Sequence, residues 1–483
     1  MKKNNRISTG VAGLDEVLHG GLFPQRAYQL RGAPGSGKTT LGAHFLFEGA
    51  RNGETSLFIS LGETEELIKA NMKAVSLDLS GVKFLDLSPS SDFFAEVESY
   101  DLFSPAEVER EPMTRQIADT IRELKPKRVF LDSITQFRYL SSDVFQYRKQ
   151  VLSFIRFIVE QGATFLMTTE SSREAPDDDI QFLVDGVIEI GHDGTERNLQ
   201  VTKYRGSGFH AGAHDFKITP NGVSVLPRLI PPAASEKQNR EQMSSGIPEV
   251  DELIGGGIER GTVTLISGPT GVGKTTFGVQ FLKEAAGRGE TSIIYEFEED
   301  ISVLEKRCEN LNIPVSAMVK SGKLIIKKVE PLAFTAWEFA NMVREDVEKK
   351  GAKIVMIDSI AGYKLSVKGK DLVSHLHSLC KYLVNSGIAV FLITEVKNIT
   401  GDFQVSDIDV SYLTDNIIFI RYYENLGALN RAIGVLKKRL SNFEKTLREI
   451  QFTRYGIKVG RPITDLRGIL KGTPEKVEEK NGQ

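Results

Sequence analysis

The sequence predicts an α/β protein of two tandem domains, each a mostly parallel sheet with helices on both faces. Three observations predict this fold class. The chain has 483 residues, enough for two to four domains of about 100–200 residues each. The sequence of its first half is repeated in its second half at a constant offset. Lys274 stands 236 positions after Lys38, and Thr291 stands 236 positions after Thr55. Within each half, short apolar runs alternate with segments of helical periodicity, which is typical of strand–helix–strand units.

The repeat spans whole domains rather than short solenoid units. The segments that match across the halves are RNGETSLFISLGET (51–64) with GRGETSIIYEFEED (287–300), RVFLDSI (128–134) with IVMIDSI (354–360), and LQVTKYRGS (199–207) with IGVLKKRLS (433–441). A proline-rich, then polar stretch between them is typical of a linker. The predicted parts are a first domain at 1–226, a linker at 227–242, a second domain at 243–470 and a mobile tail at 471–483.

The apolar runs VFLD, ATFLMTT, IVMID and AVFLIT predict buried strands. Two sets of apolar residues recur at helical spacing, namely Val151, Phe154, Ile155 and Ile158, and Leu372, Leu376, Leu379 and Leu383. Because parallel strands are joined by crossover helices, this alternation predicts sheets that are covered on both faces.

Composition and charge disfavour several classes of protein, although they do not exclude a local basic patch. There are 61 lysines and arginines against 64 acidic residues, a net charge of −3, so no global field attracts nucleic acid or an anionic membrane. No run approaches the roughly 18 apolar residues of a membrane span, and the basic start MKKNNRISTG lacks the apolar stretch of a signal peptide. Two isolated cysteines, Cys308 and Cys380, give no disulfide framework and favour a reducing, cytoplasmic compartment.

Each half opens with a glycine-rich loop between a strand and an amphipathic helix, GAPGSGKTT (32–40) and GPTGVGKTT (268–276). This is the G-x-x-x-x-G-K-[ST] phosphate loop in the context that the motif requires. Its backbone N–H groups form a concave anion site, and the helix N-terminus adds partial positive charge. A chance glycine-rich turn is the alternative, which two copies in register disfavour. The predicted nucleotide-binding residues are Gly32, Gly35, Ser36, Gly37, Lys38, Thr39 and Thr40, and Gly268, Thr270, Gly271, Val272, Gly273, Lys274, Thr275 and Thr276.

Four residues are candidates to bind the Mg²⁺ ion that accompanies the phosphates. Thr39 and Thr275 can offer a hydroxyl to the ion, while the loop lysines reach the β- and γ-phosphates. Asp132 and Asp358 end apolar strands, where a carboxylate can steady the hydrated metal.

Hydrolysis also needs a carboxylate to orient water and a positive charge on the transition state. In the second half, Glu298 and Glu299 follow the strand after the first helix. In the first half only Glu63 stands there, because Gly62 is opposite Glu298. A pair of glutamates at a strand end is often merely solvated, but a position one strand beyond a phosphate loop favours a catalytic role.

Together these residues resemble the RecA-like ATPases, and within them the tandem KaiC family of circadian-clock ATPases and autokinases. The resemblance covers nearly the whole chain and rests on the two phosphate loops, LDSI and IDSI, MTTE and ITE, KYRG and KKR, and SYLTD. It implies two tandem RecA-like P-loop domains, Mg²⁺-dependent ATP hydrolysis, and a hexameric double ring with ATP at each subunit interface. A site that a neighbour completes is a heterologous contact, and such contacts can close into rings.

The resemblance also implies basic residues that act on the neighbouring subunit. They match Lys203 and Arg205 in the first half and Lys437 and Arg439 in the second. Without the resemblance, Lys-x-Arg on a strand is more often part of a solvated face. An arginine finger can contribute about 10³–10⁵ in rate, so an isolated subunit is expected to be almost inactive.

In the second half the resemblance implies serine/threonine autophosphorylation, with phosphoryl transfer to hydroxyls of the adjacent subunit. The acceptor pair falls on Ser411 and Tyr412, where a tyrosine replaces the family's usual threonine, and further hydroxyls lie within 406–414. An ordinary polar loop serine is the alternative reading. Gln181 and Phe182 occupy this place in the first half and have no hydroxyl, so phosphorylation is expected in the second half alone.

Gly62 is the clearest departure from the family, whose first domain carries a carboxylate pair and hydrolyses ATP slowly. Only Glu63 remains here; we expect slow, Glu63-dependent hydrolysis, the alternative being a domain that binds ATP mainly to hold the ring together. In the second half, Glu298 takes the place of the family's base for phosphoryl transfer. The C-terminal ITDLRGILKGTPEKV resembles a segment that folds over the ring pore and on which regulatory proteins act.

Two other functions stay open from the sequence. One is a DNA-acting recombinase or helicase of the same superfamily, which favours a basic channel and, in the RadA branch, a CxxC zinc module ahead of the ATPase. The other is a scaffold that binds ATP only for assembly. The slightly acidic charge balance and the lack of a CxxC pair disfavour the first. The predicted function is a KaiC-like ATPase acting in timing or signalling.

Overall fold

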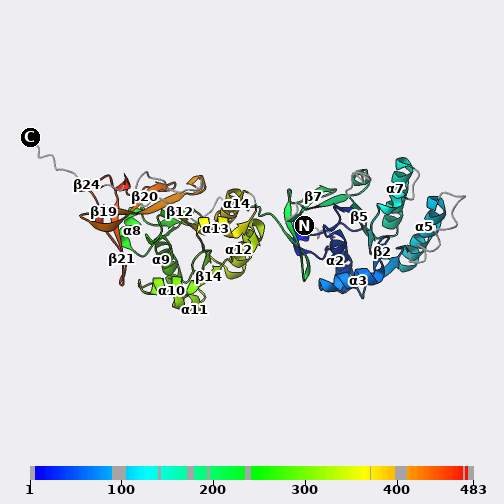
Figure 1. Ribbon diagram of the computed structural model, residues 1–483, viewed down its shortest axis with the longest axis horizontal. Coiled ribbons are helices and arrows are strands. Elements are labelled where there is room, and N and C mark those ends of the chain that lie inside the picture. Colours follow the sequence, from blue (N-terminus) through cyan, green and yellow to red (C-terminus); the bar gives the residue numbers. More distant parts are fainter. Residues whose placement is uncertain are drawn as a thin grey trace, which may run out of the picture. The chain divides into compact units, whose positions relative to one another are not determined.

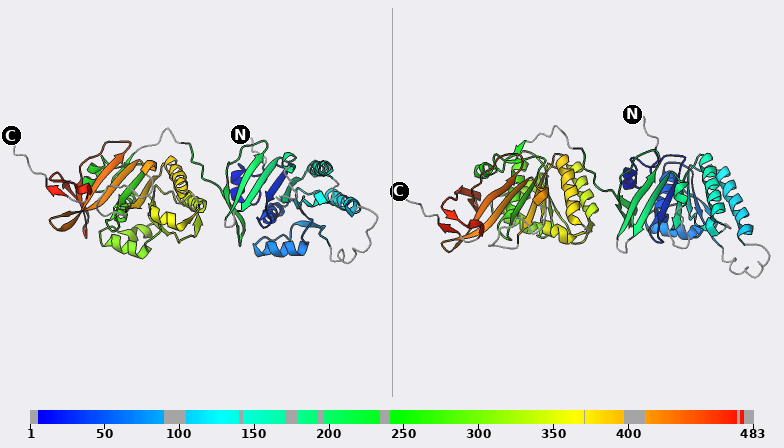
Figure 2. Two further views of the ribbon diagram at one scale, coloured as in Figure 1. Left: turned by 45° about the horizontal axis from the view of Figure 1, so that its top comes forward. Right: turned by 90° about the horizontal axis from the view of Figure 1, so that it is seen from above.

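The computed structural model describes residues 6–89, 105–139, 143–170, 179–192, 196–233, 241–369, 371–396, 411–471 and 474–476. The chain divides into two compact units, Met1–Arg228 and Leu229–Gln483, which we call the first and the second lobe (Figure 1). Each lobe contains a nine-stranded sheet with helices on both faces, as Figure 2 shows from two further sides. The predicted fold class is confirmed.

The sheet of the first lobe has the strand order β3-β2-β4-β5-β1-β6-β7-β8-β9. The first six strands in this order, from β3 to β6, are parallel to one another. The strands β7, β8 and β9 extend the sheet with antiparallel pairing. The strands are β1 (Ala27–Gly32), β2 (Ser56–Ser60), β3 (Lys83–Asp86), β4 (Arg128–Asp132), β5 (Thr164–Glu170), β6 (Gly186–His192), β7 (Arg197–Tyr204), β8 (His214–Thr219) and β9 (Gly222–Leu226). The helices are α1 (Ala12–Val17), α2 (Lys38–Arg51), α3 (Glu65–Ala74), α5 (Pro105–Leu124), α6 (Gln136–Tyr139) and α7 (Val144–Glu160), with the 3₁₀ turn η2 (Ile180–Phe182).

The second lobe repeats this topology with the order β14-β13-β16-β18-β12-β19-β20-β21-β22. These strands are β12 (Val263–Gly268), β13 (Ser292–Glu296), β14 (Leu324–Lys328), β16 (Ile354–Asp358), β18 (Ala389–Glu395), β19 (Asn416–Asn425), β20 (Ala428–Lys438), β21 (Arg448–Thr453) and β22 (Gly456–Pro462). The helices are α8 (Pro248–Leu253), α9 (Lys274–Gly287), α10 (Ile301–Glu309), α11 (Val315–Lys320), α12 (Ala336–Lys350), α13 (Ile360–Ser366) and α14 (Leu372–Asn385). Three short pairs complete the lobe: β10 (Gln242–Met243) with β11 (Ile258–Glu259), β15 (Phe334–Thr335) with β17 (Val367–Lys368), and β23 (Leu466–Arg467) with β24 (Glu475–Lys476).

The glycines of each phosphate loop let the chain turn from a strand into a helix. Gly37 (φ 103°) and Gly273 (φ 108°) adopt left-handed backbone conformations directly before α2 and α9, where any other residue would be strained. The preceding strands, β1 and β12, are central and have parallel neighbours on both sides. Each loop therefore leaves the carboxyl end of a central strand, the end at which open α/β sheets bind ligands.

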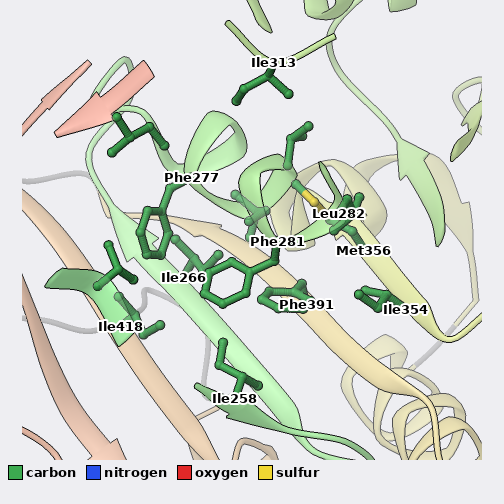
Figure 3. Close-up of a cluster of buried hydrophobic side chains, with 14 of the residues drawn as sticks. Ile258, Ile266, Phe277, Phe281, Leu282, Ile313, Ile354, Met356, Phe391 and Ile418 are labelled. Atoms are coloured by element: carbon green, nitrogen blue, oxygen red, sulfur yellow. The ribbon is translucent and has the colours of Figure 1, made fainter. Parts of the chain in front are cut away.

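Apolar side chains on both faces of each sheet form the cores. In the second lobe, α8 to α11 cover one face, and α12 to α14 cover the other. Figure 3 shows the first of these clusters, in which the ring of Phe281 on α9 lies 5.7 Å from that of Phe277 and 5.2 Å from that of Phe391 on β18. The helix that begins at Lys274 is thus fixed to the sheet by its own apolar face.

Both ends of the second lobe make ordered contacts. Leu229, in the predicted linker, is 5% exposed and belongs to the hydrophobic cluster under α12 and α14, and Asn385 Nδ2 donates a hydrogen bond to Pro232 O at 2.6 Å. At the other end, Glu475–Lys476 pairs with Leu466–Arg467. None of the helices that the structure describes combines the length and the hydropathy needed to cross a membrane.

Candidate nucleotide-binding sites

In the first lobe, the phosphate loop lies beside the predicted metal-binding aspartate. Lys38 Nζ donates to the carbonyl oxygens of the first two loop residues, at 2.8 and 3.0 Å, and Thr39 Oγ1 donates to Asp132 Oδ2 at 2.6 Å. A cavity of about 320 Å³ opens beside the loop and is lined by residues 35–40 and by Glu63, among others. The predicted loop, metal and carboxylate residues of this lobe therefore lie together.

In the second lobe, the loop lysine lies near a carboxylate at the end of the neighbouring strand. Lys274 Nζ donates to Pro269 O at 3.0 Å and lies 3.6 Å from Glu395 Oε1, and Thr270 Oγ1 donates to the same oxygen at 3.1 Å. Burial lowers the pKa of Lys274, whereas the charges of Glu395 and Asp358 oppose this effect. These carboxylates therefore favour the ammonium form that binds phosphate.

Not every residue of the second motif faces the cavity of about 200 Å³ that opens there. Thr270, Gly271, Gly273, Lys274 and Thr275 line it, together with Glu298, Glu299, Arg307, Asp358, Ser359 and Glu395. Val272 and Thr276 are instead buried, at 0% and 2% exposure. Gly268 lies against the next strand, because a Cβ atom there would be 2.2 Å from Ile420 O. These three residues support the shape of the loop.

Two carboxylates lie side by side at the carboxyl ends of adjacent strands in the second lobe. Glu296 of β13 is in register with Asp358 of β16, and they are 2% and 7% exposed. Burial, and then the charge of Glu296, raises the pKa of Asp358 to about 7, whereas a hydrogen bond from Thr275 lowers it. Asp358 Oδ2 is buried and has no hydrogen-bond partner among the described residues. A free carboxylate oxygen next to a threonine hydroxyl fits Mg²⁺, which takes few protein ligands and completes its shell with water and phosphate oxygens.

In the described part of the first lobe, a serine takes the place of one member of this carboxylate pair. Ser60 of β2 stands opposite Asp132 of β4. Thr168 Oγ1 donates to Asp132 Oδ1 at 2.5 Å, and Thr39 donates to the other oxygen. Each oxygen of Asp132 therefore has a hydroxyl donor, and the polar surroundings of the two aspartates differ.

The adjacent carboxylates Glu298 and Glu299 have different partners. Glu298 Oε1 accepts a hydrogen bond from Ser359 Oγ, whereas Glu299 Oε2 accepts one from Arg307 Nη2 at 2.6 Å. The backbone N–H groups of both glutamates donate to Glu296 Oε1, at 3.0 and 2.8 Å. The buried Glu296 therefore fixes the turn that carries both candidate catalytic residues.

The predicted basic pair of the second lobe lies at the opposite end of the sheet from the phosphate loop. Lys437 Nζ donates to Thr414 O at 2.6 Å. Arg439, whose side chain is 51% exposed, lies 3.4 Å from Asp415 Oδ1, and Asp415 Oδ2 accepts a hydrogen bond from the N–H of Val263, the first residue of β12. Since β12 has six residues and a strand rises about 3.3 Å per residue, roughly 16 Å separates its two ends.

The basic pair of the first lobe has the same placement. Lys203 Nζ donates to Gln181 O at 2.6 Å, and Arg205 N donates to Asp185 O at 2.8 Å. Asp185 Oδ2 in turn accepts from the N–H of Ala27, where β1 begins. In both lobes, therefore, the basic pair is remote from the phosphate loop of its own chain.

The candidate phosphate acceptors precede β19. Ser411 begins the 3₁₀ turn η3 (Ser411–Leu413), but its side chain lies outside the described part, as does Ser406. Tyr412 is 52% exposed, and its ring lies edge-on to that of His377, with 6.1 Å between the centroids. Arg439 Nη2 donates to Tyr412 O at 3.3 Å, so the predicted acceptor segment contacts the basic pair directly.

Four polar residues that line the second cavity were not predicted from the sequence: Glu296, Arg307, Ser359 and Glu395. Glu395 carried a usable signal, because it ends a predicted strand in the same way as Glu170. Glu296 carried none, because a glutamate within IIYEFEED has the pattern of an exposed strand residue.

Comparisons with known proteins show the family of the chain. A family model described as the KaiC ATPase matches residues 7–230 and 243–463. The circadian clock protein KaiC3 of Synechocystis sp. is 27% identical over 97% of this chain and 94% of its own length. The circadian clock oscillator protein KaiC of Parasynechococcus marenigrum is 27% identical over 98% and 93%, and that of Acaryochloris marina is 25% identical over 98% and 92%. The chain belongs to the KaiC family of ATPases and carries two such ATPase domains in tandem.

Proposed function

We propose that this chain is an ATP-hydrolysing ring protein in which the basic pair of one subunit completes the nucleotide site of its neighbour. The supporting observation is the position of Lys437 and Arg439, roughly 16 Å along β12 from the loop. At that distance they cannot contact a phosphate held by their own loop. A contact between two different surfaces of identical subunits can close into a ring, and the family resemblance implies a hexamer.

The contacts in the second lobe support the following roles. Lys274 and the loop N–H groups bind the phosphates, and Thr275 and Asp358 would hold Mg²⁺, which would neutralise charge on the phosphates. Glu298 orients the attacking water, and Arg439 of the neighbouring subunit stabilises the charge of the transition state. In the first lobe, Lys38, Thr39, Asp132, Glu63 and the pair Lys203 and Arg205 take these roles.

Coexpression of two inactive subunits tests the shared site. In rings formed from equal amounts of Lys274→Ala and Arg439→Ala subunits, about one quarter of the second-lobe sites should be active. In these sites a subunit with an intact phosphate loop lies next to a subunit with an intact arginine. The control mixes wild-type chains with the Lys274→Ala/Arg439→Ala double variant, and the double variant alone gives the first-lobe background. ATP hydrolysis is measured by phosphate release. A site within one chain predicts no recovery in the first mixture and about half the wild-type rate in the second.

A second activity, serine autophosphorylation, is favoured by the contacts of the basic pair. Lys437 and Arg439 donate to the carbonyl oxygens of Thr414 and Tyr412. If these cations reach a neighbour's phosphates, residues 411–414 come close to them as well. In the first lobe, Lys203 holds the corresponding segment at Gln181, which offers no hydroxyl there. We therefore propose that Ser411 or Tyr412 accepts phosphate in the second lobe alone.

Phosphopeptide mapping after incubation with Mg·ATP tests this activity. We expect one phosphopeptide that covers 406–414, its loss with Ser411→Ala or Tyr412→Phe according to the acceptor, and none that covers 179–185. A chain with no phosphate at 406–414 is an ATPase without this kinase activity. The names of the relatives support a role in timing or signalling. Stimulation of hydrolysis by single-stranded DNA would instead support a DNA-acting ATPase, and ring assembly without turnover would support a scaffold.

A further inference from the structure

The second cavity contains an arginine that the first cavity lacks. Arg307 lies on α10 and lines the cavity beside the phosphate loop. The residue 236 positions earlier is Asn71 on α3, which lines the first cavity. At this position of the repeat, therefore, the second cavity has a cationic side chain and the first cavity has a neutral amide.

Arg307 is one of three contacts that hold Glu299. Arg307 Nη2 donates to Glu299 Oε2 at 2.6 Å, Lys328 Nζ donates to Glu299 O at 2.9 Å, and Glu299 N donates to Glu296 Oε1 at 2.8 Å. The Arg307 and Glu299 side chains are 37% and 29% exposed. In such partly buried surroundings the attraction between opposite charges is stronger than in bulk water. The position of Glu299 is therefore fixed, and its negative charge is compensated by the charge of Arg307.

Glu298 has a different environment. Its carboxylate accepts from Ser359 Oγ, and its charge is one of those that raise the pKa of Lys274. The fold leaves space for it at Gly362 on α13, where a Cβ atom would lie 3.0 Å from Glu298 Oε1. The corresponding residue of the first lobe, four positions after Asp132, is Gln136. A glycine at this position is thus a feature of the second lobe.

We propose that Arg307 is a positioning residue that neutralises Glu299 and thereby assigns the water-orienting role in the second lobe to Glu298. This inference rests on the proposed ATP hydrolysis by that lobe. Two uncompensated carboxylates next to each other would repel one another and a bound triphosphate. The first lobe needs no such cation, because Gly62 replaces Glu298 and leaves Glu63, the counterpart of Glu299, as the single carboxylate of its turn. Corresponding glutamates thus have opposite roles in the two lobes.

Four variants of the full chain test the assignment, with the second-lobe rate defined as the phosphate release that Lys274→Ala removes. Glu298→Gln should lower this rate by at least about 100-fold, whereas Glu299→Gln should stay within about threefold of wild type. Arg307→Asn, which imports the residue of the first lobe, should lower kcat about tenfold with little change in KM. The double variant Arg307→Asn/Glu299→Gln should recover to within about threefold of wild type, because it removes the cation and the charge that the cation compensates.

Recovery in the double variant separates charge compensation from a merely structural role. Binding of a fluorescent ATP analogue and the unfolding temperature show that each variant is folded. Lys349→Asn, which removes the exposed ion pair with Glu345 on α12, is the control and should leave the rate unchanged. A double variant as slow as Arg307→Asn, or a loss in Glu299→Gln equal to that in Glu298→Gln, overturns the inference alone. If Lys274→Ala removes no phosphate release, the proposed hydrolysis by the second lobe fails with it.

Discussion

Arg439→Ala is expected to slow ATP hydrolysis by the second lobe by about 10³–10⁵-fold, the contribution of an arginine that stabilises phosphoryl-transfer charge. Its contacts within its own chain are weak, since the Arg439–Asp415 pair spans 3.4 Å and the arginine side chain is half exposed. Such pairs contribute about 0–1 kcal/mol to stability. The loss should therefore appear in turnover and not in folding.

Phosphate release at saturating ATP measures this effect, after subtraction of the rate of the Lys274→Ala/Arg439→Ala double variant. Arg461→Ala is the matched control, because Arg461 is an exposed arginine at the edge of the same sheet, on β22. Binding of a fluorescent ATP analogue by Arg439→Ala should stay close to wild type, because Lys274 and the loop are intact. Unchanged turnover would remove Arg439 from the site.

Phe281→Ala is expected to destabilise the second lobe by about 3–5 kcal/mol, the cost of removing a large aromatic side chain from a packed core. Phe281 is 1% exposed and contacts the rings of Phe277 and Phe391. It lies on α9, whose first residue is the phosphate-binding Lys274. The substitution should therefore weaken the attachment of the phosphate site to the sheet as well as the core itself.

The repeat supplies a matched substitution for this measurement. Phe45 stands 236 positions before Phe281 and is also 1% exposed. The guanidinium carbon of Arg128 lies over the Phe45 ring, 4.9 Å from the centroid of that ring. Calorimetry should resolve two unfolding transitions, with Phe281→Ala lowering one and Phe45→Ala lowering the other. Equal shifts of a single transition in both variants would contradict separate hydrophobic cores.

The fold and the phosphate loops could be predicted because their signals are local. A strand, a glycine-rich turn and a helix occupy about 25 adjacent residues, and the repeat shows them twice. The apolar runs that end at Asp132 and Asp358 mark parallel strands in the same way. The alignment of Gly62 with Glu298 likewise indicates, from the sequence alone, that the carboxylates of the two halves differ.

The partners of those carboxylates could not be predicted, because they depend on register and on the direction of side chains. Glu296 meets Asp358 only because β13 and β16 pair in that register. Arg307 on α10 donates a hydrogen bond to Glu299, which precedes that helix, and the sequence does not show which way either side chain points. Ser359 and Glu298 are 61 residues apart in sequence. No periodicity relates such pairs, so only the folded chain reveals their contacts.

The seating of Leu229 in the hydrophobic cluster of the second lobe decides where the two halves can be separated. An exchange of halves between relatives, or expression of the C-terminal half by itself, has to carry along everything from position 229. A junction placed at 242 would strip a leucine from that cluster and the carbonyl of Pro232 from Asn385. The boundary for chimeras therefore lies at the start of the connecting segment rather than at its end.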